Sequence, residues 1–185
     1  MLNPIQAVSA ALPRPLTTVS PTGSAGRPAG ATVGASPVLS ALLILLVMVL
    51  VTVGLTPNRE EFRWFLQLLR PVWLTFERWI PLIWLVIYSC FYGSALMSWM
   101  ASGRWDLMAG YLLLLVLVQS YTVLICRTRR LRNGTVIGFL GWVWGIALAI
   151  AVVPVSRVSW LLLLPYLLWS PVGTYVTWRM QRINR

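Results

Sequence analysis

The sequence predicts an all-α membrane protein, a bundle of five transmembrane helices. Of its 185 residues, 58% are hydrophobic and only 10% are charged, and the mean hydropathy is +0.78. A soluble domain would be about one quarter charged. The apolar residues also gather in five runs, each long enough to cross the hydrocarbon core of a bilayer as a helix. Composition and the lengths of these runs therefore predict the same class.

We expect two parts, an N-terminal tail over residues 1–37 and a transmembrane domain over residues 38–185. The tail is rich in Pro, Ala, Ser, Thr and Gly, and has no acidic residue. Without apolar periodicity it has no core to bury, so we expect it to be disordered. An acid-poor leader with Ser and Thr also resembles an organelle transit peptide, which is the alternative.

The predicted spans are separated by connections that carry arginine, proline or glycine. They cover residues 38–55, 79–101, 107–126, 135–153 and 158–178. The connection from Arg59 to Arg78 is the longest internal one and mixes glutamate, arginine and apolar side chains. We expect such an amphipathic segment to lie against the membrane as a short helix and lid.

The charge distribution predicts the orientation in the membrane. All 15 basic residues are arginine, and with 4 acids they give a formal net charge of +11. They lie between apolar runs and not on one face of a soluble fold, which argues against nucleic acid as a partner. Most of these arginines fall in the first loop (residues 59–78), in the third loop (residues 127–134) and in the C-terminal segment after residue 178. The positive-inside rule therefore places the C-terminus in the cytoplasm. A bacterial cell membrane is expected, with an organelle membrane as the alternative.

The residue types argue against several kinds of chemistry. The chain has no histidine, and its two cysteines, Cys90 and Cys126, do not form a CxxC pair. Histidine-based metal sites, histidine-ligated haem and histidine general-base catalysis are therefore excluded. No acidic or basic residue lies inside a predicted span, which argues against an ion-coupled transporter. We expect no enzyme, no metal and no obligatory cofactor, because no nucleophile with a base and an orienting group can be assembled.

Aromatic residues concentrate where the first loop meets the second span, between Trp64 and Tyr88. Their rings give flat contact area and keep one polar atom, which suits a pocket for an apolar ligand. The alternative is an aromatic belt that anchors the helices at the membrane interface. Small residues recur in the fourth span at Gly138, Gly141 and Gly145. This spacing fits a homodimer seam and fits packing inside one bundle equally well.

Two stretches resemble the TspO/MBR family, the tryptophan-rich sensory proteins related to the mitochondrial translocator protein. The first stretch contains Trp64-Phe65, Leu68, Arg70-Pro71, Trp73, Trp84 and Tyr88, and the second runs LLLLPYLLWSPVGTYVTWRMQRIN from Leu161 to Asn184. The chain departs from the family at Thr75-Phe76, where a Pro-Pro pair is expected, and at Gly141, where the family has Asp.

The resemblance implies a five-helix bundle, often homodimeric, with a pocket under the first loop for protoporphyrin or haem and, in some members, sterols. Trp84 and Trp169 match tryptophans that the family links to porphyrin binding and to its light-dependent breakdown. The implied lid residues are Trp64, Phe65, Pro71 and Trp73, and the further walls are Tyr88, Gln119 and Tyr166.

Charged and sterol-type contacts complete the expected site. Arg70 and Arg78 at the rim would pair with the propionates of a porphyrin. The segment with Val172, Tyr175 and Arg179 fits a cholesterol-recognition pattern, which is common by chance. We therefore expect a membrane-embedded binding protein or sensor for tetrapyrroles or similar hydrophobic ligands that regulates tetrapyrrole or stress metabolism. The alternative is a passive transporter or exporter of porphyrin, sterol or another lipid, and light-dependent porphyrin degradation is compatible as a side activity.

Overall fold

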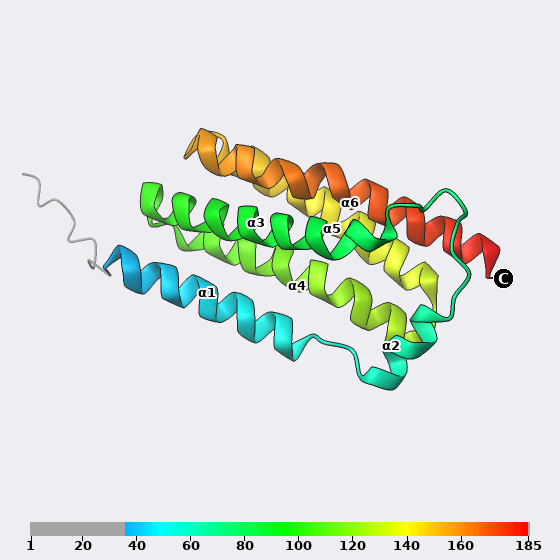
Figure 1. Ribbon diagram of the computed structural model, residues 1–185. Helices are drawn as coiled ribbons and strands as arrows, with labels where there is room; N and C mark the ends of the chain where they lie inside the picture. Colours follow the sequence, from blue (N-terminus) through cyan, green and yellow to red (C-terminus); the bar gives the residue numbers. More distant parts are fainter. Residues whose placement is uncertain (1–35, 185) are drawn as a thin grey trace, which may run out of the picture. The chain divides into compact units, whose positions relative to one another are not determined.

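The computed structural model describes residues 36–184, and every regular element in this range is a helix. The elements are α1 (Pro37–Gly54), α2 (Arg59–Leu66), the 3-10 turn η1 (Glu77–Trp79), α3 (Ile80–Ser102), α4 (Trp105–Thr128), α5 (Leu131–Val152) and α6 (Arg157–Ile183). The long helices run side by side in alternating directions, and α2 lies at the end of the bundle where α6 finishes (Figure 1). The predicted tail lies outside the described residues except for Ser36 and Pro37, which begin α1.

Within the described range, four helical segments are long and apolar enough to cross a membrane: α1, η1 with α3, α4 and α5. The fifth long helix, α6, has 27 residues and could span about 40 Å. It falls outside that group because its arginines, hydroxyl side chains and two internal prolines lower its hydropathy.

At the arginine-rich end of the bundle, the helices extend beyond the predicted spans. Helix α5 begins at Leu131 and α6 continues to Ile183, so both helices extend beyond the predicted apolar segments. A helix does not have to end at the membrane surface, because its backbone hydrogen bonds are satisfied internally on both sides. Arg127 and Arg182, in the last turns of α4 and α6, also interact favourably with the negative ends of the helix dipoles.

Helices α5 and α6 approach closely because glycine lines their contact. A Cβ atom added to Gly138 would lie 2.5 Å from Thr174 Oγ1, and one added to Gly145 would lie 2.7 Å from Tyr166 Cε1. Gly141 faces the hydroxyl of the same tyrosine. The close approach is therefore made inside one bundle, and these contacts do not support the homodimer seam at Gly138, Gly141 and Gly145.

The buried core lies mainly among α3, α4, α5 and α6, whereas α1 packs at the side with Ser40 and Met48 as its buried residues. Polar contacts hold α1 in place. Trp99 Nε1 donates to Ser40 Oγ at 3.0 Å, and Gln119 Nε2 donates to Thr52 Oγ1 at 2.6 Å. Gln119 therefore serves the contact between α4 and α1.

Candidate ligand-binding site

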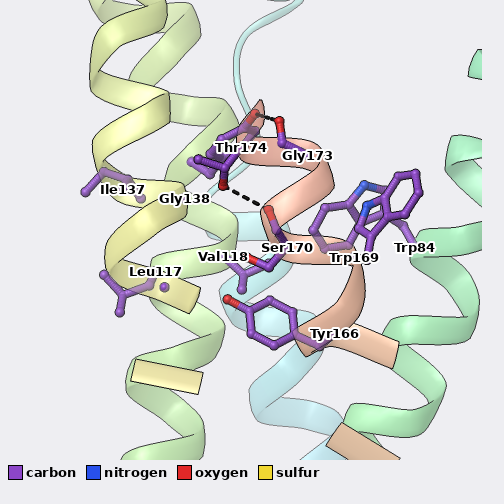
Figure 2. A pocket seen from close by; sticks show the side chains of 12 residues that line it. Trp84, Leu117, Val118, Ile137, Gly138, Tyr166, Trp169, Ser170, Gly173 and Thr174 are labelled. Carbon is purple, nitrogen blue, oxygen red and sulfur yellow. Dashed lines mark hydrogen bonds between the residues drawn. The ribbon is translucent and has the colours of Figure 1, made fainter. Parts of the chain in front are cut away.

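A small apolar cavity lies between α3, α4, α5 and α6. It has a volume of about 40 Å³ and is lined by Trp84, Leu117, Val118, Tyr121, Ile137, Gly138, Gly141, Tyr166, Trp169, Ser170, Gly173 and Thr174. Figure 2 shows α6 passing through the middle of this site, with Leu117 and Ile137 on one side and the indole of Trp84 on the other. The cavity is thus built around one helix, and the polar groups on its walls are mostly hydroxyls.

The local structure of α6 depends on two prolines. Pro165 and Pro171 lie inside the helix and have no backbone N–H, so each removes one helical hydrogen bond. The carbonyl that Pro171 leaves free is that of Leu167, and Trp142 Nε1 of α5 donates to it at 3.1 Å. A side chain from a neighbouring helix therefore replaces the lost backbone donor, as buried carbonyl groups require.

The first loop, residues 55–79, places aromatic rings over the end of the bundle where α6 finishes. Phe76 packs edge-on against Trp169 with ring centroids 6.1 Å apart, and Trp73 lies 5.9 Å from Tyr175. Trp64 and Phe65 pack against the ends of α4, α5 and α6 around Ile125, Leu131 and Met180. Helix α2 confirms that the loop contains a short helix.

A side-chain amide fastens the first loop to the end of α6. The backbone N–H of Leu69 donates to Asn184 Oδ1 at 2.9 Å, and Asn184 Nδ2 donates to the carbonyl of Leu69 at 2.9 Å. The same Nδ2 also donates to the carbonyl of Met180 at 2.9 Å, which fixes the side chain on its own helix. Sequence analysis noted Asn184 only as part of the resemblance, because a partner 115 positions away leaves no local pattern.

The structure brings together only part of the predicted site. Trp84, Tyr166 and Trp169 line the cavity, and Tyr88 stacks on Trp84 with centroids 5.6 Å apart. The lid residues Trp64, Phe65, Pro71 and Trp73 belong to the first loop, as expected, but do not reach the cavity wall. Gln119 is not a wall residue, because its amide is bonded to α1.

The two predicted rim arginines differ in their partners. Arg70 forms an ion pair with Glu77. Arg78 lies over the ring of Trp79 at 5.6 Å and has no acidic partner among residues 36–184. Of the two rim arginines, only Arg78 is therefore without an acidic partner in the described part of the chain. Val172, Tyr175 and Arg179 follow one another along α6, where Tyr175 is already covered on one side by Trp73.

Sequence reasoning missed a larger space beside the cavity. An open groove of about 370 Å³ lies between α3 and α6 and is lined by Leu82, Ile83, Val86, Ile87, Pro165, Leu168 and Trp169. Trp169 lines both spaces. Pockets for small ligands usually measure about 300–1,000 Å³, so the groove has the size of a ligand and the inner cavity does not. A ring-shaped ligand can enter the inner cavity only if the side chains that line the cavity move.

Comparison with known protein families decides the relationship of this chain. The model of the TspO/MBR family matches residues 40–183. The chain belongs to the TspO/MBR family. This family has a five-helix transmembrane fold, so α6 is the fifth membrane helix in spite of its lower hydropathy. TspO/MBR proteins are membrane proteins that bind tetrapyrroles and other hydrophobic ligands, and are generally not enzymes. A comparison with curated proteins gave no match.

Proposed function

We propose that this protein is a membrane-embedded sensor that binds tetrapyrroles such as protoporphyrin or haem and regulates tetrapyrrole or stress metabolism. The observation that carries the proposal is the convergence of Trp84 from α3 and Trp169 from α6 on one apolar cavity (Figure 2). Flat indole rings bind a planar macrocycle through stacking and burial of its apolar faces. The porphyrin is a ligand here, and no obligatory cofactor is needed.

The charged edge of such a ligand fits the loop side of the site. A porphyrin carries propionate groups, which need a cation or water when the ring is buried. Arg78 immediately precedes Trp79 and α3, so its guanidinium can pair with a propionate at the membrane interface. With no histidine in the sequence, haem would be held by its faces and edges or by a Tyr, Cys or Met ligand.

The test is a titration of the purified protein with protoporphyrin IX. The shift of the porphyrin absorption band is followed, because this signal does not depend on the number of tryptophans. Replacement of Trp84 or Trp169 by Leu should weaken binding about tenfold, since one stacked ring contributes about 1.5 kcal/mol. Trp105→Leu is the matched control, because Trp105 is 76% exposed and begins α4, about three helical turns before Leu117, and does not line the cavity.

Unchanged affinity in both cavity variants, with the helices intact by circular dichroism, would contradict the proposed site. The alternative function, passive transport of porphyrin or lipid, predicts net flux of porphyrin into liposomes containing the protein. A sensor binds porphyrin without net flux. Slow loss of bound porphyrin under illumination would add a photochemical side activity to either function.

A further inference from the structure

We propose that the groove between α3 and α6 is a second binding site, where an amphipathic ring ligand dissolved in the bilayer binds before it passes Trp169 into the inner cavity. The proposal rests on the proposed function and adds the route by which the ligand arrives. It assigns the groove a single occupant, a planar macrocycle with an apolar body and a carboxylate edge.

The inner cavity and the groove share one wall residue, Trp169. Trp169 is part of the wall of the inner cavity and of the outer groove, so its indole is the partition between them. Figure 2 shows Trp169 and Trp84 in the space between α6 and α3, on the side of α6 turned away from Leu117 and Ile137. Rotation of the Trp169 side chain would join a groove of about 370 Å³ to a cavity of about 40 Å³.

The helix segment that carries Trp169 contains two prolines and can deform. Pro165 and Pro171 bracket this residue, and each removes a backbone hydrogen bond from α6. Helices bend most readily at proline, and although Trp142 Nε1 holds the Leu167 carbonyl that Pro171 leaves free, that bond comes from a side chain of α5 and not from the backbone of α6. Pro165 also lines the groove itself. The partition therefore stands on a part of α6 that yields more easily than a regular helix.

The first loop closes the route from water to the cavity. The first loop is fastened to α6 by two hydrogen bonds between Leu69 and Asn184, each of 2.9 Å. Pro71 and Leu74 of the loop are buried. A ligand that entered from water would have to break this attachment and expose these side chains. The groove, in contrast, is open and its lining is apolar, so a ligand already dissolved in the bilayer meets no such barrier.

The position of Arg78 defines the chemical class of the ligand. Leu82, in the first turn of α3, lines the groove, and Arg78 lies four residues earlier in the 3-10 turn η1, which leads directly into α3. The guanidinium is therefore close along the chain to the end of the groove formed by Leu82. An apolar ring in the groove would thus place a carboxylate beside the guanidinium, where the two groups can form a charge-assisted hydrogen bond.

Stopped-flow mixing tests the route. The protein in liposomes is mixed with vesicles that contain protoporphyrin IX, and both the association rate and the equilibrium affinity are measured. Leu82→Phe narrows the groove, and Leu85→Phe is its control: both leucines are on α3 and exposed, 49% and 62%, but only Leu82 lines the groove. Asn184→Ala unfastens the first loop and tests the aqueous route.

We expect Leu82→Phe to lower the association and dissociation rates of the inner cavity by a similar factor, several-fold, and to leave the affinity of the inner cavity unchanged, because its contacts are intact. Leu85→Phe should have the rates of the unsubstituted protein, whereas Asn184→Ala should associate faster, because unfastening the loop opens the aqueous route that the attachment closes. Equal rates in the two leucine variants would overturn the groove as the route, and unchanged association in Asn184→Ala would contradict the claim that the attachment closes the aqueous route. Absence of saturable binding in the unsubstituted protein would contradict the proposed function itself, which distinguishes the two failures.

Discussion

At the scale of single residues, neighbouring side chains of the same type have different roles. Arg70 and Arg78 are equivalent in the sequence as rim arginines, yet Arg70 is paired with Glu77 and Arg78 lies on Trp79. An arginine already bonded to a carboxylate has to break that pair before it can bind another anion. The difference follows from the loop conformation and could not be derived from residue type.

Replacement of Arg78 by Gln should weaken the binding of protoporphyrin IX several-fold, because a charge-assisted hydrogen bond contributes about 1.5–3 kcal/mol in a buried setting and less at an exposed rim. Binding of the dimethyl ester of the same porphyrin should not change, since the ester carries no charge. Titrations of both ligands by absorption check this. Arg104→Gln, in the short connection before α4, is the control. Equal weakening for acid and ester would contradict a pairing between Arg78 and a propionate.

At the scale of the elements, the glycines of α5 set the distance to α6. Ala in place of Gly145 would put a Cβ 2.7 Å from the Tyr166 ring and 3.1 Å from Leu167 Cδ2. We expect a loss of about 1–3 kcal/mol in the free energy of unfolding, typical of overpacking. The thermal midpoint in detergent should fall by a few degrees. Gly173→Ala is the matched control, because nothing lies within 4 Å of its added Cβ, and Ala favours the helix by about 1 kcal/mol.

The same variant tests the homodimer alternative. If Gly145 served a seam between two copies, the substitution would change the oligomeric state in size-exclusion chromatography with light scattering. Packing inside one bundle predicts a lower midpoint with an unchanged mass. An unchanged midpoint would contradict the contact between Gly145 and Tyr166.

Much of the element structure could be predicted because apolar runs of membrane length permit little besides helix. The helix extensions at Leu131 and Ile183 could not, since polar residues beyond the bilayer core are compatible with helix and with loop alike. At the site, Trp84 and Trp169 were found through motif spacing, and the structure places both on the cavity. Gln119 was misplaced because the sequence does not show which neighbouring helix a polar side chain will meet.

At the scale of the whole molecule, charge is distributed unequally between the two ends of the bundle. The turn between α4 and α5 contains Arg129 and Arg130, and the first loop is joined to the same end through Asn184. The short turn between α3 and α4 contains Arg104, which is paired with Asp106. The free positive charge is therefore concentrated at the end that carries the first loop, which predicts a cytoplasmic location for this end.

Single cysteines at Arg130 and Arg104 test this orientation in a Cys90→Ser, Cys126→Ser background. In intact cells, a membrane-impermeant maleimide should label the cysteine at 104 and leave the one at 130 unlabelled until the membrane is permeabilised. A permeant maleimide should label both, which controls for accessibility. The opposite labelling pattern would reverse the predicted topology.

The bond between Leu69 and Asn184 also constrains how the protein is made. The two residues are 115 positions apart, and the intervening chain includes all of α3, α4, α5 and α6. The first loop is synthesised early but acquires its attachment only after those helices have been translated and inserted. Until then, the aromatic rings of the loop have no helix ends to cover. The attachment of the first loop to α6 is therefore among the last contacts to form during biosynthesis.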